Sequence, residues 1–377
     1  MKNNSASERY KRQISIKEFG EASQQKLSAA KLLMVGAGGL GCPILQYLCA
    51  AGIGTIGIID DDVVMLNNLH RQILYSVNDI GKSKAEQASK HLQRLNPDIK
   101  IISYNLRLST DNAIDLINQF DYVVDGTDNF ATRYMINDAC VLMNKPLIYG
   151  AISQFEGQVS IFNSRSKKSE QPVNYRDIFP EPPKTGEVLN CEEAGVLGIM
   201  PGIIGLMMAN ETIKLITGIG EPLINKLLTF NALTNQQYEL QLNPTEISSS
   251  LIPKDINAFK QTNYEWLCSP GIKESEIDMD AFLPLINNKD VDIIDVREPG
   301  EWPDANDFIH IKIPLKELEE NTASIKNKTV VCFCKSGTRS YEAAKKLSSI
   351  FKNEKTVYSL KGGILLWNKY HANQKHE

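Results

Sequence analysis

The sequence predicts an α/β protein made of two units: a larger one with a mainly parallel, helix-covered sheet, and a smaller α/β one. Three observations carry this prediction. Short apolar runs alternate with helical patterns from residue 31 to about residue 149, and a second such series follows residue 275. Residues 246–274 between them show no periodicity. Alternation of strands and helices is typical of parallel sheets. We therefore expect domains at 1–245 and 275–377, joined by a linker at 246–274.

In the larger unit, helices are expected at 40–51, 84–95 and about 134–143, between strands at KLLMVG, TIGIID, KIISYN, DYVVDG and PLIYG. LLTFNAL and QQYELQL end the unit as two further strands. Residues 164–190 are polar, contain several prolines and lack a period, so we expect a long mobile loop there. In the smaller unit, the strands DIIDV, TVVCFC and TVYSL accompany a helix at 340–350.

Composition argues against several classes of partner. The chain has 377 residues and a formal net charge of −4, so it offers no basic surface for nucleic acid. Its most apolar long segment, 201–218, contains Asn210, Glu211 and Lys214, which favours a buried amphipathic helix over a membrane span. The seven cysteines are irregularly spaced and the N-terminus is polar, which favours a cytoplasmic protein with free thiols.

A glycine-rich loop follows the first strand. Gly36, Gly38 and Gly41 form G-x-G-x-x-G within VGAGGLG, which also contains Gly39, between a predicted strand and a helix. Such a loop lets backbone N–H groups and a helix N-terminus approach a phosphate, and Asp60 at the end of the next strand can bind a ribose. This motif alone favours a Rossmann-like nicotinamide- or flavin-dependent dehydrogenase.

The residues that follow favour a triphosphate instead. Arg71 and Lys84 can neutralise charge as pyrophosphate leaves, and an NAD site does not need both cations. Asp128 follows the strand DYVVD, where the carboxyl end of a parallel strand faces the ligand crevice and an acid can bind Mg²⁺. Asp61 is expected to be a solvated charge, and Asp62 could either contact a ligand or form a turn.

Residues 9–243 resemble the ubiquitin-activating-type adenylation domains, with MoeB, ThiF and HesA as the most similar members. The matching pieces appear in family order: RYKRQ, VGAGGLG, IIDDDVV, NNLHRQ, GKSKAE, GTDN with Arg133, EGQVSIF and CEEAGVLG. The resemblance implies that ATP and Mg²⁺ are bound and that the C-terminal Gly-Gly carboxylate of a small ubiquitin-like, MoaD- or ThiS-like sulfur carrier is adenylated. It assigns the ribose to Asp60, the phosphates to Asn68, Arg71, Gln72 and Lys84, and Mg²⁺ to Asp128. It also implies a homodimer, with Arg12 reaching into the ATP site of the partner subunit.

Two cysteine features of the family deserve comparison with this chain. Cys191, in NCEEAGV, occupies the position of the family's loop cysteine and could be catalytic or a small packing residue. Relatives usually carry two C-x-x-C pairs that bind a structural zinc. Here the first pair is replaced by Asn174 and Asp177 and the second falls in NPTEISSS, so we expect no zinc. Cys268 is alone and cannot supply four ligands.

A second candidate site begins at Cys334, in the sequence CKSGTRS between a strand and a helix. Backbone N–H groups and a helix N-terminus lower a thiol pKa and stabilise anionic sulfur, and Arg339 could orient the loop or hold an anion. A cysteine phosphatase would need C-x5-R, which the chain lacks because residue 340 is serine. A purely structural role suits Cys332 better. A persulfide carrier therefore remains the favoured interpretation.

Residues 275–370 resemble single-domain rhodaneses through IIDVREPGEW, IPL, the Cys334 loop and LKGGILLW, although ANDFIH replaces the usual GHIPGA. Asp295 and Arg297 would support the loop. The two resemblances together imply that a Cys334 persulfide, filled by a cysteine desulfurase or thiosulfate, converts the adenylated carrier to a thiocarboxylate. Molybdopterin synthesis is favoured as the pathway that uses this thiocarboxylate, and thiamine thiazole formation and tRNA thiolation are the other possible pathways. A dehydrogenase remains an alternative, as does a non-catalytic carrier-binding scaffold with an independent thiosulfate sulfurtransferase domain.

Overall fold

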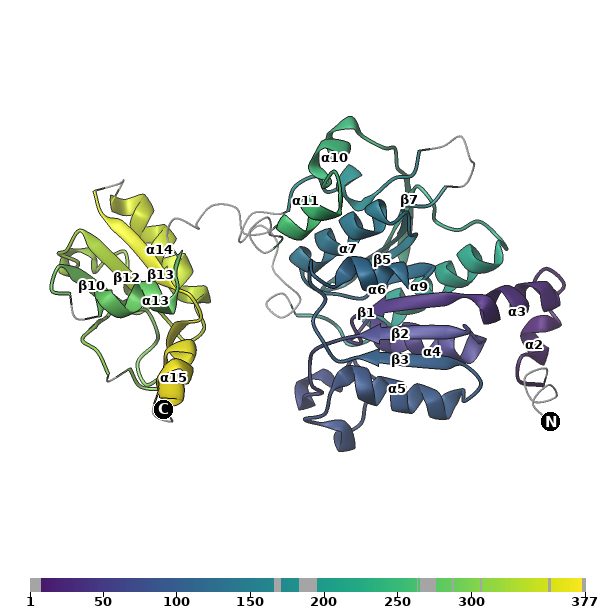
Figure 1. Ribbon diagram of the computed structural model, residues 1–377, viewed down its shortest axis with the longest axis horizontal. Helices are drawn as coiled ribbons and strands as arrows, with labels where there is room; N and C mark the ends of the chain where they lie inside the picture. The colour runs from purple at the N-terminus through teal and green to yellow at the C-terminus, as the bar shows by residue number, and fades with distance from the viewer. Residues whose placement is uncertain are drawn as a thin grey trace. The chain divides into compact units, whose positions relative to one another are not determined.

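Figure 1 shows the computed structural model, which describes residues 8–165, 171–182, 195–262, 264, 276–286, 288–305, 307–351 and 354–374. Packing divides the chain into two compact units, Met1–Cys268 and Ser269–Glu377, and each is described by itself. No helix in these described ranges is long and apolar enough to cross a membrane.

The first unit is built on an eight-stranded sheet in the order β3-β2-β1-β4-β5-β6-β7-β8. Neighbours from β3 to β5 pair in parallel, and those from β5 to β8 pair antiparallel. The strands are β1 (Lys31–Val35), β2 (Thr55–Ile59), β3 (Lys100–Tyr104), β4 (Tyr122–Asp125), β5 (Leu147–Ser153), β6 (Glu156–Phe162), β7 (Lys226–Asn231) and β8 (Gln236–Gln241). The predicted mainly parallel α/β fold is confirmed.

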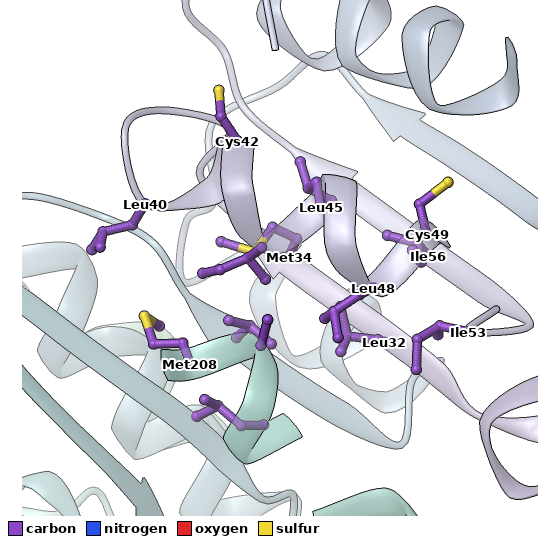
Figure 2. Packing of buried hydrophobic residues seen from close by; sticks show 14 of the residues in the cluster. Leu32, Met34, Leu40, Cys42, Leu45, Leu48, Cys49, Ile53, Ile56 and Met208 are labelled. Atoms are coloured by element: carbon purple, nitrogen blue, oxygen red, sulfur yellow. The ribbon is translucent and has the colours of Figure 1, made fainter. Parts of the chain in front are cut away.

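Helices cover both faces of this sheet because the central strands are apolar on both sides. In β1, Leu32 and Met34 enter one core, and Leu33 and Val35 enter the other. The first face carries α3 (Gly20–Ala29), α4 (Gly41–Ala51), α5 (Lys84–Leu95) and α9 (Met200–Thr217); the second carries α6 (Ala113–Asn118), α7 (Phe130–Leu142) and α11 (Ile256–Gln261). Figure 2 shows the first core, where Leu48 of α4 lies near Leu32 of β1.

Shorter elements complete the unit: α2 (Lys11–Ile14), α10 (Glu246–Leu251) and the 3-10 turns η1 (Leu66–Asn68), η2 (Val77–Asp79) and η3 (Tyr175–Asp177). The helix expected at 84–95 has those bounds, and Ser83 caps it by accepting a hydrogen bond from the Glu86 N–H. The helix expected from residue 134 begins earlier, at Phe130, because the Asn129 side chain accepts a hydrogen bond from the Thr132 N–H at 2.8 Å.

Two expectations about irregular segments need correction. Within the expected mobile loop 164–190, residues 173–176 are buried, with Tyr175 and Arg176 each 2% exposed, while 166–170 and 183–190 lie outside the described residues. Within the expected linker 246–274, α10 and α11 belong to the first unit, and Phe259 and Tyr264 enter its second core. Both segments make buried aromatic and ionic contacts with α7. These tertiary contacts fix their structure although the local sequence shows no helix or strand periodicity.

The second unit has a five-stranded parallel sheet in the order β11-β10-β12-β13-β9. Its elements are β9 (Glu276–Ile277), α13 (Met279–Phe282), η4 (Leu283–Leu285), β10 (Val291–Asp295), β11 (Ile311–Lys312), η5 (Leu315–Glu317), η6 (Thr322–Ser324), β12 (Thr329–Phe333), α14 (Thr338–Phe351), β13 (Thr356–Leu360) and α15 (Gly363–Gln374). α14 packs on one face through Ala343, Ala344 and Leu347, and α13 and α15 pack on the other.

Candidate active sites

A cleft of about 870 Å³ lies where the strand order of the first sheet reverses. β1 lies between β2 and β4 in the sheet. The connection that leaves β1 therefore runs to one side, toward β2, and the connection that leaves β4 runs to the other side, toward β5. Ligands of open parallel sheets bind at such a switch point, outside the carboxyl ends of the strands. Most of the predicted nucleotide-site residues line this cleft: Gly36, Gly38, Gly39, Asp60, Asn68, Arg71, Gln72, Lys84 and Asp128.

The glycine loop after β1 folds tightly on itself and against the turn after β4. Gly36 has φ of +88°, and a Cβ there would lie 3.0 Å from the Gly126 carbonyl oxygen. A Cβ on Gly41 would lie 2.2 Å from the Gly36 carbonyl oxygen, so no side chain can be placed there. Gly41, which does not line the cleft, therefore acts through packing of the loop.

Asp60 ties the loop to the end of β2. Its Oδ2 accepts a hydrogen bond from the Ala37 N–H at 2.7 Å, and its Oδ1 accepts one from the Asp62 N–H at 2.9 Å. Burial raises the pKa of this carboxyl, while the Ala37 N–H and the Lys84 charge oppose that rise. The carboxylate thus holds two backbone segments together at the edge of the cleft.

Two cations flank the same edge. Lys84 is the first residue of α5, its side chain is 6% exposed, and its Nζ lies 2.8 Å from Asp62 Oδ2. Asp62, whose role the sequence left open, therefore pairs with the predicted phosphate-binding lysine. Arg71 is half-buried and its guanidinium donates to the Asn67 carbonyl oxygen at 3.1 Å. Within the described residues the buried Gln72 Oε1 has no hydrogen-bond partner, so we expect it to gain one when the cleft is filled.

A buried ion pair that the sequence did not single out holds the turn at 126–128. Asp125 ends β4, and its Oδ1 accepts hydrogen bonds from Thr127 N–H at 2.9 Å and Thr127 Oγ1 at 2.6 Å. Arg133 on α7 donates from NH2 to the Thr127 carbonyl oxygen at 3.1 Å, and its Nε lies 3.5 Å from Asp125 Oδ2. The pair thus clamps the turn from two sides and presents Asp128, which is exposed and makes no hydrogen bond or ion pair within the described ranges.

The sequence contains a signal for Asp125 but none for its pairing with Arg133. Asp125 is an acid at the carboxyl end of a parallel strand, the place where such sheets bind ligands. Its burial, and the approach of Arg133 from α7, depend on tertiary packing. Burial raises the Asp125 pKa, and the Arg133 charge opposes that rise.

Arg12 lies apart from the cleft, and two cysteines fall outside the ranges that the structure describes. Arg12 is exposed on α2 and does not line the cleft as the described part of its own chain forms it. The helix that carries Arg12 is anchored, because Gln13 Nε2 donates to the Ala51 carbonyl oxygen at 3.0 Å and Tyr10 is buried. Cys191 and Cys268 lie outside the residues that the structure describes.

In the second unit, Cys334 directly follows β12 and precedes α14, with 1% of its surface exposed. The Gly337 N–H donates to Cys334 Sγ at 3.2 Å, and Gly337 has φ of +103°. The Ile364 N–H donates to the Cys334 carbonyl oxygen at 2.9 Å, so the loop is seated against the first turn of α15. The sulfur thus accepts a hydrogen bond from one backbone N–H of a loop that leads into the N-terminus of α14, which suits a negatively charged sulfur species. Cys332 is fully buried beneath α14, as expected for a packing residue.

Two ion pairs flank this loop. Arg297 is 5% exposed and binds the buried Asp295 carboxylate through Nε at 2.8 Å and NH2 at 2.6 Å. Arg339 binds both oxygens of Glu301, at 2.5 and 2.7 Å. The Arg339 guanidinium lowers the Glu301 pKa to about 2, so this carboxylate is ionised at neutral pH. The sequence did not identify Glu301, because its partner lies 38 residues away on another element.

Comparison with known proteins agrees with this geometry. Residues 10–249 match the ThiF family, and residues 278–370 match the rhodanese-like domain. The chain is 40% identical to the probable adenylyltransferase/sulfurtransferase MoeZ of Mycobacterium tuberculosis, covering 96% of this chain and 92% of that protein. It is 37% identical to the probable molybdopterin-synthase adenylyltransferase of Porphyra purpurea, covering 97% of this chain and 94% of that protein.

Two further comparisons cover the first unit. The sulfur carrier protein adenylyltransferase of Thermus thermophilus is 47% identical over 60% of this chain and 83% of its own. The crystal structure of E. coli MccB with ATP shares the fold, with a TM-score of 0.52 and 22% identity over 60% of this chain and 68% of that chain. The chain therefore belongs to the ThiF family and is an enzyme that joins an adenylyltransferase domain to a rhodanese-like sulfurtransferase domain.

Proposed function

We propose that the first unit uses ATP to adenylate the C-terminal Gly-Gly carboxylate of a small ubiquitin-like sulfur carrier of the MoaD or ThiS kind. One observation carries this proposal: the glycine loop, Arg71, Lys84 and Asp128 line a single cleft at the switch point of the sheet. A nicotinamide cofactor would not need this concentration of cations and an unpaired carboxylate. A nucleoside triphosphate with its metal ion would.

The proposed roles follow from the positions of the side chains. The carrier carboxylate attacks the α-phosphate and pyrophosphate leaves, which the enzyme favours by alignment and charge stabilisation. Asp60 would bind a ribose hydroxyl, and phosphate oxygens would be bound by Asn68, Arg71, Gln72 and Lys84, all of which line the cleft. Lys84 leaves its pairing with the exposed Asp62 when the triphosphate offers more negative charge.

The residues present fit a magnesium ion bound together with ATP. Mg²⁺ usually takes one or two carboxylates and completes its coordination with waters and substrate phosphates. Asp128 supplies one such carboxylate, exposed in the cleft and unpaired within the described residues. When bound there, the ion would neutralise phosphate charge, while Asp125 and Arg133 keep the Asp128 turn in place.

The proposed second step uses Cys334. Its persulfide, supplied by a cysteine desulfurase or by thiosulfate, attacks the acyl carbon of the carrier adenylate with its outer sulfur. AMP leaves, and the carrier is joined to Cys334 through an acyl disulfide. A second thiolate, for which Cys191 is the candidate, attacks the Cys334 sulfur of that bond. The carrier leaves as a thiocarboxylate, and an external dithiol later reduces the Cys191–Cys334 disulfide.

Further features of the proposal concern assembly and pathway. The exposed position of Arg12 on an anchored α2 supports a homodimer in which it completes the partner's ATP site. The similarity to the Porphyra purpurea protein supports molybdopterin synthesis as the outlet. We expect a cytoplasmic enzyme, since the persulfide and thiolate chemistry requires reduced cysteines.

One assay tests the adenylation step. The full-length protein is incubated with ATP, Mg²⁺ and each of several purified carriers that end in Gly-Gly, and pyrophosphate exchange is measured. Exchange with at least one carrier, and a mass shift corresponding to the acyl-adenylate, are the expected results. Failure to exchange with every carrier, together with NAD(H) binding, would support the dehydrogenase alternative.

Replacement of Arg133 tests the clamp on the Asp128 turn. We expect Arg133→Lys to lower the rate of pyrophosphate exchange about 10-fold and to raise the Mg²⁺ concentration needed for half-maximal rate, because lysine cannot bridge Thr127 and Asp125 as a planar guanidinium does. The measurement is exchange rate against Mg²⁺ concentration, with thermal unfolding as a check. An unchanged Mg²⁺ dependence in a folded variant would show that Arg133 serves stability alone.

The pair of Arg339 and Glu301 can be tested by a double-mutant cycle on thiosulfate:cyanide sulfurtransfer. We expect Glu301→Ala and Arg339→Ala each to slow transfer about 10-fold and the double variant to be little slower than either, because both remove the same support of the Cys334 loop. Glu319→Ala, which removes an exposed ion pair with Lys346, is the matched control and should leave the rate unchanged. Fully additive losses would separate the functions of the two residues.

A further inference from the structure

Side-chain and backbone groups of four residues form a closed ring of hydrogen bonds between η3 and the start of α10. Asp177 Oδ1 accepts from the Thr245 N–H at 2.6 Å and from Thr245 Oγ1 at 3.0 Å. Asn174 Nδ2 donates to Asp177 Oδ2 at 2.7 Å and to Ser248 Oγ at 3.4 Å. Ser248 Oγ donates in turn to the Thr245 carbonyl oxygen at 3.0 Å. We call these four residues, Asn174, Asp177, Thr245 and Ser248, the polar clasp.

The clasp has the spacing of a zinc site without the ligands of one. Asn174 and Asp177 are separated by two residues, as are Thr245 and Ser248, which is the spacing of the two C-x-x-C pairs expected from the resemblance. Structural zinc is bound tetrahedrally by four side chains, which are cysteine thiolates and histidine imidazoles. An amide, two hydroxyls and one carboxylate do not fit that requirement, and both oxygens of Asp177 already accept hydrogen bonds.

The clasp works beside a second, buried tether. Arg176 donates from Nε and NH2 to the Asp138 carboxylate of α7, at 2.8 and 2.7 Å. Tyr264, which follows α11, donates its hydroxyl to the same carboxylate at 2.8 Å. The Tyr175 N–H donates to Asn137 Oδ1 at 2.8 Å. The segment 174–177 is thereby fastened to α7, while the clasp fastens it to α10.

This fastening determines one wall of the nucleotide cleft. Tyr175 and Phe179 both line the cleft, and their ring centroids lie 4.9 Å apart. The Tyr175 ring also lies 5.4 Å from the Tyr149 ring of β5. Since Tyr175 lies between Asn174 and Asp177 in the chain, a change in the clasp changes the position of an aromatic wall residue.

We propose that the polar clasp replaces a structural zinc in this chain and positions the Tyr175–Phe179 wall of the cleft by hydrogen bonding alone. Asp177 is the central positioning residue, because its two oxygens accept from Asn174 and Thr245 and so join the two segments. The inference rests on the proposed function only where nucleotide binding is used as the readout; metal content and unfolding test it independently.

The first test measures metal. The full-length protein is purified from zinc-supplemented cells, its zinc content is determined, and thermal unfolding is followed with and without a strong chelator. We expect far less than one zinc per chain and an unfolding midpoint that the chelator leaves unchanged. One zinc per chain, with a midpoint that falls when it is removed, would overturn the proposal whether or not the protein adenylates a carrier.

The second test separates positioning from stability. Asp177→Ala leaves the Thr245 and Asn174 donors without their acceptor, and we expect the dissociation constant of a non-hydrolysable ATP analogue to rise about 10-fold. Asp255→Ala is the matched control, because Asp255 likewise accepts a backbone N–H hydrogen bond, from Ala258, but α11, which it caps, contributes no residue to the cleft. Asp255→Ala should lower the unfolding midpoint without weakening binding. If Asp177→Ala does not fold, Asp177→Asn, which keeps one acceptor oxygen, takes its place.

Equal binding by the Asp177 variant and the wild-type protein would refute the positioning role. Loss of analogue binding in the wild-type protein itself would instead refute the proposed nucleotide site, so the two failures are distinguishable.

The third test restores the metal site. A variant with Asn174→Cys, Asp177→Cys, Thr245→Cys and Ser248→Cys should take up one Co²⁺ per chain more than the wild-type protein and show thiolate-to-cobalt absorption. A variant that retains Ser248 and carries the other three changes should bind more weakly. A folded four-cysteine variant that binds no additional metal would show that the four positions do not surround one point, and would overturn the equivalence with a zinc site.

Discussion

Lys84→Ala is expected to lower the rate of carrier adenylation by about 10²- to 10³-fold while the protein remains folded. The lysine begins α5 beside the glycine loop, where removal of one preorganised charge or donor facing the reacting phosphates has an effect of this size. Stability should change little, because the Asp62 side chain is 67% exposed and stays solvated without its partner. Pyrophosphate exchange at saturating ATP measures the effect.

Lys82 provides the matched control for this prediction. It precedes the same helix and is exposed, and within the described structure its side chain donates only to the Asn78 carbonyl oxygen, at 2.7 Å. Lys82→Ala should therefore leave exchange within about 2-fold of the wild-type rate, as removal of a solvated surface charge usually does. An equal loss in both variants would mean that the general positive charge near α5, and not the position of Lys84, supports the reaction.

Cys334→Ser is expected to reduce thiocarboxylate formation by at least about 10³-fold without affecting adenylation. Serine can still accept the Gly337 N–H bond that Cys334 Sγ accepts, but its oxygen cannot carry a transferable sulfur. Carrier mass, measured after incubation with ATP and a sulfur donor, should show the acyl-adenylate or its hydrolysis product and no thiocarboxylate. The pyrophosphate exchange rate should equal that of the wild-type protein.

Cys332→Ala distinguishes the reactive thiol from its neighbour. Cys332 lies on β12, which Cys334 directly follows, and is fully buried, and burial raises the pKa of its thiol. Its removal should reduce the free energy of unfolding by about 1 kcal/mol through the small cavity that it leaves. Thiocarboxylate formation should continue. A Cys334→Ser variant that still made thiocarboxylate would reassign the sulfur-carrying step to another cysteine.

The elements that the sequence predicts well are those whose signal is local. β1 and β2 are short apolar runs, and α5 lies between a capping serine, Ser83, and Asn96, so its bounds follow from nearby residues. The buried state of 173–176 has no such signal. It depends on Arg176 meeting Asp138, 38 residues away, and a polar, proline-containing segment does not indicate a buried guanidinium.

The same distinction applies to the sites. The residues predicted around the cleft belong to ordered motifs that follow strands, and parallel topology brings the carboxyl ends of those strands to one edge. The GTDN motif includes Arg133 in its surroundings but indicates no role for it, because its partner is the backbone oxygen of Thr127. Glu301 was missed for a similar reason, since only the folded chain brings it to Arg339. Supporting residues of this kind do not occur at a fixed spacing from the residues that they support, so no motif identifies them.

The contact between the glycine loop and the turn after β4 has an evolutionary consequence. Gly36 and Gly126 approach through their backbones, and an added Cβ at Gly126 would also lie 2.4 Å from Met34 Cε. No single substitution at either glycine can be accommodated by a compensating side chain at the other, because neither has one to shorten. Divergence among descendants of this gene should therefore leave Gly36 unchanged, because its φ of +88° and the backbone oxygen of Gly126, 3.0 Å from an added Cβ, both disfavour a side chain there.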